Sequence, residues 1–354
     1  MSRFLTQGLS ALEPYTPGEQ PRDRRYIKLN TNESPFPPPQ AVIDAAAREA
    51  GQLQLYSDPA NTELTERLAK TYGVRPGQVI VTNGSDEVLS FAFQAFADAA
   101  HPLAFADITY GFYPVFAALY RIPWRTVPLK EDFSIDPDDY IGTRETVVIA
   151  NPNAPTGLCL PLGEIERIIA SNPDRVVIVD EAYVDFGGES AVGLLPRYEN
   201  LLVTRTFSKS RSLAGARLGF GMGSEALIAD LHTVRCSTNP YNVNRMTAAA
   251  GVAALENDAY FIRNCRVIEQ NRDALTQGLR GLGFAVPDSR ANFVFARSRR
   301  IGGRELYLEL KRRGILVRHF EAPRTRDYNR ITVGTAEQVA TLLQTVKQIL
   351  EEQV

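Results

Sequence analysis

The stretch VVIANPNAPTG at residues 147–157 decides the fold, because an apolar strand ends within it and a polar turn follows at once. Residues 147–149 are β-branched, which is typical of a strand buried on both faces of a parallel sheet. Asn151 and Asn153 stand where the strand ends, beside prolines and a glycine, which are usual residues for leaving a strand. The stretch alone leaves open whether the two asparagines only shape the turn or also bind a ligand.

Similar apolar segments alternate with helical ones over residues 41–244. The strand segments are QVIVT (78–82), PLAFAD (102–107), TVVIANP (146–152), RVVIVDEAYVDF (175–186) and NLLVTRTFSK (200–209). Near-continuous β-branched strands separated by helices indicate a mainly parallel sheet covered on both faces. We therefore expect an α/β fold with a large domain at 41–244, and in such sheets ligands bind at the carboxyl ends of the strands.

The two ends of the chain differ from this region. Residues 1–40 are polar and rich in proline, which predicts an arm that cannot build a core and packs with the small domain. Residues 245–354 begin with long helices and continue with the shorter strands NFVFAR (292–297), GILVRHF (314–320) and NRITVGT (329–335). This pattern predicts a smaller, separate α+β domain.

The overall composition excludes several classes of function. A net charge of −2 gives no general attraction to nucleic acid or to an anionic membrane, so an anionic ligand would need a local arginine cluster. No signal-peptide core and no run of membrane-spanning length is present. The three cysteines and three histidines are scattered, which argues against disulfides and a metal site. We expect a cytoplasmic protein that binds no metal.

A first candidate ligand site is VTNGSDE at residues 81–87, where a strand runs through Gly84 and Ser85 into a helix. The free N–H groups and positive dipole end of such a helix suit a phosphate. The alternative is an ordinary helix start, with Asp86 and Glu87 favourably placed in the first turn.

A second candidate is Asp180, which the strand VVIVD delivers to its carboxyl end. An acid there could bind a ribose hydroxyl or pair with a cationic nitrogen. The ribose interpretation is disfavoured, because GFGMGS at 219–224 does not match the dinucleotide-binding pattern and does not follow a first strand.

A third candidate is Lys209, which follows a strand directly within TRTFSKSRSLAGARLGF at residues 204–220. A buried ammonium is costly, and a lysine whose pKa is lowered by burial is a nucleophile for Schiff-base formation. Ser208 and Arg217 lie nearby and suit a phosphate. The alternative is a solvated loop.

Together these segments bring a phosphate cradle, an acid, a Schiff-base lysine and a polar turn to one sheet edge, a combination that matches pyridoxal 5'-phosphate. The chain resembles the fold-type I pyridoxal-phosphate aminotransferases, and within them the histidinol-phosphate aminotransferases, over nearly its whole length. The resemblance rests on LNTNESPFPPP (29–39), LYSDP (55–59), TNGSDE (82–87), TYGFY (109–113), NPNAPTG (151–157), VDEAYVDF (179–186), TFSKSRSLAGARLGF (206–220) and RITVGT (330–335).

The resemblance implies a role for each cofactor residue. Lys209 would form the Schiff base and then move the substrate's α-proton, Asp180 would pair with the pyridinium nitrogen, and Tyr183 would hydrogen-bond the phenolic oxygen. Tyr110 would stack on the ring, unless it is a core tyrosine. The implied phosphate-binding residues are Gly84, Ser85, Ser208 and Arg217, and Asp86 completes the cofactor-binding set.

The resemblance also implies a homodimer with shared active sites, in which Tyr56 reaches the partner subunit's cofactor phosphate. On the substrate side it implies that Arg330 binds the substrate phosphate and then a carboxylate of glutamate. Arg318 is a possible helper, with a solvated surface charge as the alternative. Tyr15 and Asn32 would contribute from the N-terminal arm.

The implied activity is transamination of L-histidinol phosphate with 2-oxoglutarate, giving imidazole-acetol phosphate and glutamate in histidine synthesis. Two alternatives keep the cofactor: a threonine-phosphate decarboxylase, and an aromatic amino-acid aminotransferase with Arg330 on an α-carboxylate. A pyridoxal-binding transcription regulator is disfavoured, since no helix-turn-helix module precedes the matching region and the charge is not basic.

The chain departs from the family pattern at one position. The residue before Pro-Thr-Gly is usually an asparagine that donates to the cofactor's phenolic oxygen, and here it is Ala154. Asn153 is the nearest replacement, provided that the backbone has already left the strand, especially if the Ala154–Pro155 bond is cis. The alternative is that Asn153 only holds the turn.

Overall fold

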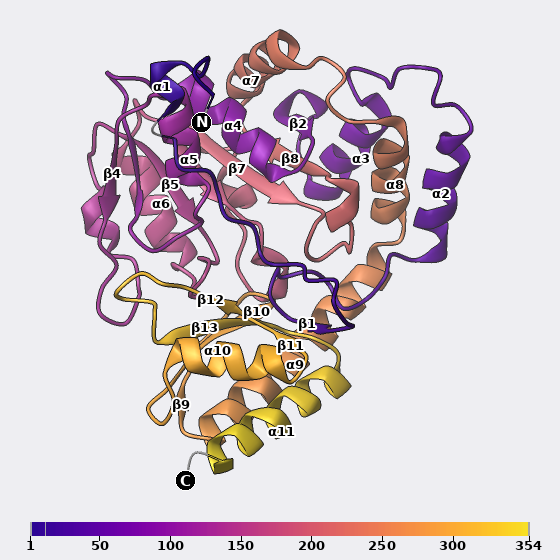
Figure 1. Cartoon of the computed structure of the whole chain (residues 1–354). Helices are drawn as coiled ribbons and strands as arrows, with labels where there is room; N and C mark the ends of the chain where they lie inside the picture. The colour runs from indigo at the N-terminus through magenta and orange to yellow at the C-terminus, as the bar shows by residue number, and fades with distance from the viewer. Residues whose placement is uncertain (1, 11, 353–354) are drawn as a thin grey trace.

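The computed structural model describes residues 2–10 and 12–352, which form two lobes with the N-terminal arm running between them (Figure 1). The large lobe contains a seven-stranded sheet, and the small lobe contains a four-stranded sheet with helices packed on it. The expected α/β class, a mainly parallel sheet covered by helices plus a smaller α+β part, is confirmed.

The strands and helices have the following bounds. The strands are β1 Ile27–Lys28, β2 Val79–Thr82, β3 Leu103–Ala106, β4 Trp124–Val127, β5 Thr146–Ala150, β6 Val177–Asp180, β7 Leu201–Thr206, β8 Gly219–Met222, β9 Phe284–Ala285, β10 Phe293–Ser298, β11 Ile315–Leu316, β12 Arg318–His319 and β13 Tyr328–Thr332. The α-helices are α1 Gln7–Ser10, α2 Gln40–Ala50, α3 Thr62–Tyr72, α4 Ser85–Phe96, α5 Tyr113–Tyr120, α6 Leu162–Ser171, α7 Glu225–Thr238, α8 Arg245–Glu256, α9 Asp258–Gly281, α10 Gly303–Arg312 and α11 Ala336–Glu352. Short 3-10 helices are η1 Pro76–Gln78, η2 Pro137–Tyr140, η3 Val184–Phe186, η4 Ala191–Leu194 and η5 Ala214–Ala216.

The large sheet has the strand order β2-β8-β7-β6-β5-β3-β4, and only β8 runs antiparallel to its neighbours. Every residue of β5, β6 and β7 is buried, which explains why these strands are apolar without alternation. Their register places Ala150, Asp180 and Thr204 side by side across three strands. Because these strands are parallel, the polar residues that follow them meet at one edge.

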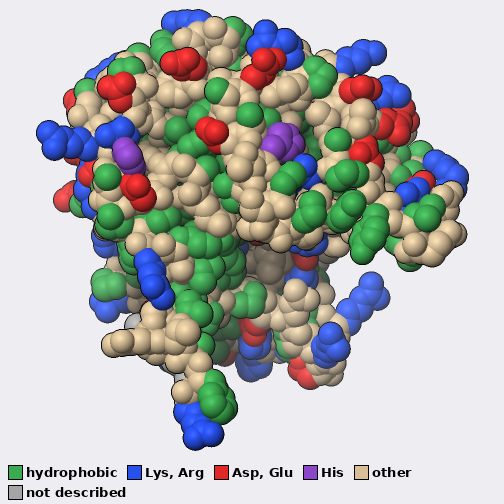
Figure 2. Space-filling view, turned by 90° about the horizontal axis from the view of Figure 1, so that it is seen from above, with side chains coloured by type: hydrophobic (Ala, Val, Ile, Leu, Met, Phe, Trp, Pro, Cys, Tyr) green, Lys and Arg blue, Asp and Glu red, His purple; other side chains and the backbone are tan. Residues whose placement is uncertain are grey.

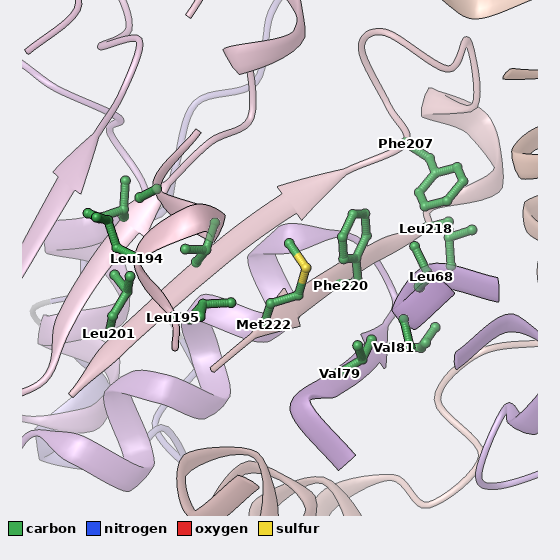
Figure 3. Packing of buried hydrophobic residues seen from close by; sticks show 14 of the residues in the cluster. Leu68, Val79, Val81, Leu194, Leu195, Leu201, Phe207, Leu218, Phe220 and Met222 are labelled. Carbon is green, nitrogen blue, oxygen red and sulfur yellow. The ribbon is translucent and has the colours of Figure 1, made fainter. Parts of the chain in front are cut away.

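A tightly packed layer of apolar side chains lies beneath the β7–β8 end of the sheet (Figure 3). Phe207 and Leu218 flank the loop between the two strands, and Phe220 of β8 packs edge-on against Phe207 at 5.7 Å between ring centroids. Burial of a phenylalanine or leucine side chain stabilises a fold by roughly 1.5–3 kcal/mol. The loop that carries Lys209 is therefore held at both ends by buried apolar side chains.

The small sheet has the order β12-β13-β10-β9, and its core includes side chains from α9, α10 and α11. The arm joins this lobe: β1 pairs in parallel with β11, and the Thr332 amide donates to the Leu29 carbonyl at 3.0 Å. The arm thus packs with the small lobe while it passes the carboxyl ends of the large sheet (Figure 1).

Helix α8 packs on the large lobe rather than on the small one. The sequence placed the start of the small domain at residue 245, where this helix begins. Its buried alanines, Ala250, Ala253 and Ala254, belong to the core of the large lobe, and the helix contacts α2 and α3. A run of small residues allows this close contact between helices. The sequence pattern of such a helix does not show which lobe it packs on.

The surface carries mixed charges. Figure 2 shows acidic and basic side chains interspersed over the face seen from above, as the net charge of −2 suggests. Across residues 2–10 and 12–352, no helix combines the length and apolar character needed to cross a membrane.

Gly219 allows strand β8 to approach the start of helix α4 closely. A Cβ atom there would lie 2.3 Å from both the Gly84 carbonyl carbon and the Ser85 nitrogen, which are backbone atoms that cannot rotate away. We predict that Gly219→Ala destabilises the fold by about 1–3 kcal/mol in urea unfolding, since overpacking forces the backbone apart.

Gly163 provides the matched control, because nothing lies within 4 Å of a Cβ built on it in the first turn of α6. Gly163→Ala is expected to leave stability unchanged or to raise it by up to about 1 kcal/mol. Equal effects of the two substitutions would contradict the close approach at Gly219.

Candidate active site

A cavity of about 390 Å³ lies at the carboxyl edge of the large sheet. It brings together eight of the residues that the sequence singled out: Ser85, Asp86, Tyr110, Asp180, Tyr183, Ser208, Lys209 and Arg217. An adjoining cavity of about 570 Å³ is lined by Tyr15, Arg318 and Arg330. Tyr110 and Ala154 line both cavities, so the two spaces meet at these residues.

Asp180 places a carboxyl group deep in the first cavity. Strand β6 ends with this residue, and its side chain is only 5% exposed. Burial raises the pKa of the Asp180 carboxyl to about 6, although hydrogen bonds from Tyr113 and Thr204 act in the opposite direction. The ionised carboxyl is therefore held in an unfavourable place, where a cationic ligand group would stabilise it.

Two residues that the sequence did not single out orient this carboxyl. The hydroxyl of Tyr113 donates to Asp180 Oδ2 at 2.8 Å, and the hydroxyl of Thr204 donates to Oδ1 at 3.2 Å. Thr204 is the neighbour of Asp180 across strands β6 and β7. The alignment of strand ends could have indicated Thr204, whereas Tyr113 comes from helix α5 and left no such signal.

Lys209 lies in a turn after strand β7, and the residues around it bind side chains that do not line the cavity. Arg205, four residues earlier, makes a buried ion pair with Glu181 at 3.3 Å and a partly exposed one with Asp185 at 2.8 Å. The hydroxyl of Ser210, next to the lysine, donates to Asp185 at 2.5 Å. These contacts fix the backbone, so that Lys209 points into the cavity, with Nζ 5.7 Å from the centre of the Tyr183 ring.

The start of helix α4 and the Lys209 turn form a cradle for an anion. Gly84 adopts φ 83° just before the helix, and a Cβ atom there would lie 2.6 Å from an Arg217 nitrogen. The glycine thus makes room for the guanidinium, which also approaches Ser208 Oγ at 3.5 Å and Asp86 Oδ2 at 3.3 Å. The first N–H groups of a helix have no intrahelical acceptor and can bind a phosphate beside this arginine.

Tyr110 forms one wall of the cavity. Its hydroxyl donates to Asp86 Oδ1 at 2.8 Å, and burial together with that carboxylate raises its pKa well above the usual value. Its ring lies 6.2 Å from that of Tyr15, which comes from the arm and packs on Phe112 at 4.8 Å. The arm therefore contacts the wall of the cavity directly.

The two asparagines of the opening stretch serve the turn. Asn151 exchanges hydrogen bonds with Leu160, and Asn153 donates to the Ile108 carbonyl at 2.9 Å and to Thr156 at 3.2 Å. The Oδ1 atom of Asn153 accepts the Thr109 hydroxyl at 2.7 Å. The Asn153 side chain thus bonds to its own turn and to the neighbouring segment, and Asn153 is not among the residues that line the first cavity. The cofactor-binding role considered for it stays a prediction.

Asn32 reaches the cavity only through Tyr183. Its side chain is 1% exposed, and its Nδ2 donates to the Tyr183 hydroxyl at 2.9 Å. Tyr183 lines the cavity, while Asn32 lies behind it. The substrate contact that the resemblance implies for Asn32 stays a prediction, and the contact present in the structure is the one with Tyr183.

The adjoining cavity contains the arginines of the small lobe. Arg330 lies between the rings of Phe293 and Phe320, at 5.3 Å and 5.9 Å from their centres. Its Nε atom is buried without a hydrogen-bond partner in the described part of the chain, and burial lowers the pKa of its guanidinium. Arg318 instead donates to the carbonyls of Thr16 and Pro17 and so holds the arm.

Tyr56 lies away from both cavities of its own chain. It is 79% exposed and stacks on Tyr241 at 4.5 Å between ring centroids. Leu53 and Leu55 beside it are also exposed. An exposed tyrosine among exposed leucines suits contact with another protein surface.

Comparison with known proteins agrees with this arrangement. Residues 24–346 match the sequence pattern of the family described as aminotransferase class I and II. Histidinol-phosphate aminotransferase 1 of Bradyrhizobium diazoefficiens is 48% identical over 350 residues, which cover 99% of this chain and 100% of that protein. Histidinol-phosphate aminotransferase 1 of Burkholderia pseudomallei is 49% identical over 354 residues, covering 99% of each chain.

A solved structure has the same fold. The crystal structure of histidinol-phosphate aminotransferase from Sinorhizobium meliloti, in complex with pyridoxal-5'-phosphate, superimposes with a TM-score of 0.86 at 24% identity. The match covers 94% of this chain and 93% of that chain. With a family pattern that spans most of its length and near-full-length relatives at almost half identity, the chain belongs to the aminotransferase class I and II family.

Proposed function

We propose that this protein is a pyridoxal-phosphate-dependent aminotransferase that acts on L-histidinol phosphate, with 2-oxoglutarate as the amino acceptor, in histidine synthesis. One observation carries the proposal: Lys209, Asp180 and an anion cradle line the same cavity. The relatives named histidinol-phosphate aminotransferase support the choice of substrate.

The residues of the first cavity fit the cofactor. Ser85, Ser208 and Arg217 would hold its phosphate, and Asp180 would pair with the ring nitrogen, where a cation offsets the burial that raises the pKa of this carboxyl to about 6. When bound, pyridoxal phosphate supplies an aldehyde for a covalent link to an amine and a ring that withdraws electrons from the substrate carbon.

The chain itself supplies the proton transfers and the orientation. The Lys209 amine would hold the cofactor, and as a free amine it would be the base that takes and returns the substrate's α-proton. The Tyr183 hydroxyl would donate a hydrogen bond to the ring oxygen, and Tyr110, which also lines the cavity, would cover one face of the ring. Since Tyr15 packs against the Tyr110 wall, the arm helps to exclude water.

Arg330 would bind the anionic group of each substrate in turn. Its buried Nε atom has no hydrogen-bond partner among residues 2–10 and 12–352, and the guanidinium lies between two aromatic rings, an arrangement that suits a phosphate or carboxylate. Threonine phosphate and aromatic amino acids also carry such groups, so a decarboxylase and an aromatic aminotransferase remain the alternatives. The outcome of the substrate assay decides among them.

We further propose a cytoplasmic homodimer in which Tyr56 contacts the cofactor phosphate of the partner subunit. The exposure of Tyr56 and its distance from the cavity of its own chain support this role.

The substrate assay tests the proposed function directly. We predict that the purified protein with added pyridoxal phosphate forms glutamate from histidinol phosphate and 2-oxoglutarate, and that Lys209→Ala abolishes turnover without unfolding the protein. Carbon dioxide release from threonine phosphate, or faster turnover of phenylalanine or tyrosine, would favour one of the alternatives. An active Lys209→Ala enzyme with an unchanged cofactor spectrum would contradict the role of Lys209.

A second prediction concerns Arg330. Arg330→Ala should raise the KM for both histidinol phosphate and 2-oxoglutarate by about tenfold to over a hundredfold, because a lost charge-assisted hydrogen bond costs roughly 1.5–3 kcal/mol. Arg326→Ala, which changes an exposed arginine of the same lobe, is the control and should leave both values unchanged. Unchanged KM values for Arg330→Ala would make it a structural residue.

A third prediction separates stability from function at Asp180. Because burial raises its pKa to about 6 in the folded protein, ionisation destabilises the cofactor-free fold above that pH by roughly 3 kcal/mol, at 1.36 kcal/mol per pKa unit. This cost disappears as the pH falls toward the ordinary carboxyl pKa of about 4. Asp180→Asn should therefore stabilise the cofactor-free protein at pH 8 but not at pH 4, while weakening cofactor binding.

The nearby Asp185 is the matched control with the opposite sign. Burial opposes its ionisation, but Arg205 and Ser210 hold its pKa below the usual range. Asp185→Asn should destabilise the protein at pH 8. Urea unfolding at both pH values measures these effects, and a loss of stability for Asp180→Asn at pH 8 would contradict the prediction.

A further inference from the structure

Among the described residues, one side-chain donor, Asn32, forms a hydrogen bond to the Tyr183 hydroxyl. The turn on the other side of the cavity contributes Ala154, which lies in the same buried cluster as Tyr183 and has no polar side-chain atom. Asn153, the preceding residue, uses its amide nitrogen to donate to Ile108 and Thr156. The hydrogen-bonding state of this hydroxyl therefore depends on the arm.

The direction of the hydrogen bond between Asn32 and Tyr183 is set by the small lobe. The Asn32 backbone N–H donates to Thr332 Oγ1 at 3.0 Å, so the threonine oxygen is already an acceptor. Its own proton is donated to Asn32 Oδ1, also at 3.0 Å. The other end of the amide, Nδ2, must then face Tyr183 and donate to it at 2.9 Å.

In a chain of hydrogen bonds in which each group accepts one bond and donates the next, every bond strengthens the one that follows it. Here the chain passes from the Asn32 backbone through Thr332 and the Asn32 amide to Tyr183. Because the Tyr183 oxygen accepts from Asn32, its single proton is free to point into the cavity. Each acceptor in such a chain becomes a better donor.

The backbone conformation and the backbone hydrogen bonds of Asn32 fix the position of its side chain. Its φ of 57° lies in the left-handed region, which asparagine and aspartate tolerate better than most residues. Its carbonyl accepts from Asn292 Nδ2 at 2.9 Å. The residue is thus bonded through its N–H, its carbonyl and both ends of its amide.

We propose that Asn32 is a positioning residue, which fixes the Tyr183 proton toward the cofactor's ring oxygen through a hydrogen-bond chain that passes through Thr332. This inference rests on the proposed cofactor and deepens the proposed function. Thr332 follows Arg330 by two residues on β13, so the same strand supports the substrate arginine and the donor to the cofactor. Asn32 does not touch the substrate.

Substitution of Asn32 by aspartate tests the chain. Asn32→Asp keeps the shape and the left-handed backbone, but a carboxylate accepts the Tyr183 proton instead of donating to its oxygen. The ring oxygen of the cofactor then loses its donor, which destabilises the form with more negative charge. In the cofactor-loaded protein, the pKa read from the visible absorbance should rise by about one unit, a tenfold change, and kcat should fall more than KM rises.

Three further variants make the test specific. Tyr183→Phe removes the hydroxyl that would donate to the cofactor, so it should give the largest rise in the pKa read from the visible absorbance. Thr332→Val keeps the side-chain shape but removes the hydroxyl that orients the amide, so its titration should fall between wild type and Tyr183→Phe. Thr332→Ser retains the hydroxyl and should titrate as wild type.

Several outcomes would overturn the inference. If Asn32→Asp and Thr332→Val are folded yet titrate as wild type, Asn32 is a structural residue only. A rise in substrate KM with no change in the absorbance titration would make it a substrate contact. If Tyr183→Phe shifts nothing, the hydroxyl does not serve the cofactor, although cofactor binding and the proposed function stand. Failure of the wild-type protein to bind pyridoxal phosphate is visible before any variant is compared, and it would overturn both proposals.

Discussion

The buried carboxyl of Asp180 is the constraint on which the rest of the site depends. The strand that carries it is apolar and fully buried, so the charge arrives at a place where water cannot stabilise it. The hydroxyls of Tyr113 and Thr204 orient it without neutralising it. A carboxylate in this state is stabilised when a positively charged ligand group binds next to it. The anion cradle and Lys209 line the same cavity, so they can contact other parts of that ligand.

Alternation along the chain separates the reactive residues from those that hold them. Asp180 faces the cavity, while Glu181 turns to the opposite side and pairs with Arg205. In the same way Lys209 faces the cavity, whereas Ser210 binds Asp185 behind it. Burial raises the pKa of Glu181 to about 7, against the opposing effect of Arg205. The charged residues behind the cavity therefore bind one another, and they hold Asp180 and Lys209 in place without lining the cavity themselves.

The residues at strand ends could be predicted from the sequence, and the residues that act across the fold could not. Asp180 and Lys209 follow apolar strands, and parallel strands bring their carboxyl ends together. Tyr113 and Thr204 required the helix position and the strand register. The contacts of Asn153 could not be predicted, because a polar residue beside a strand end can face either way. In the structure its amide nitrogen donates to Ile108 and Thr156. Asn32 binds a residue 300 positions away, a separation that no local pattern encodes.

The same separation has a consequence for how the protein is made. Asn32 and Thr332 are 300 residues apart, so the arm leaves the ribosome long before its partner strand exists. At about 5–20 residues per second, that interval is roughly 15–60 s. The large sheet, whose strands are closer in sequence, can form during that time, whereas the arm can dock only after β13 has been synthesised. The arm is therefore made before the large sheet but takes its place after it, and the active site is completed only once β13 has joined the arm.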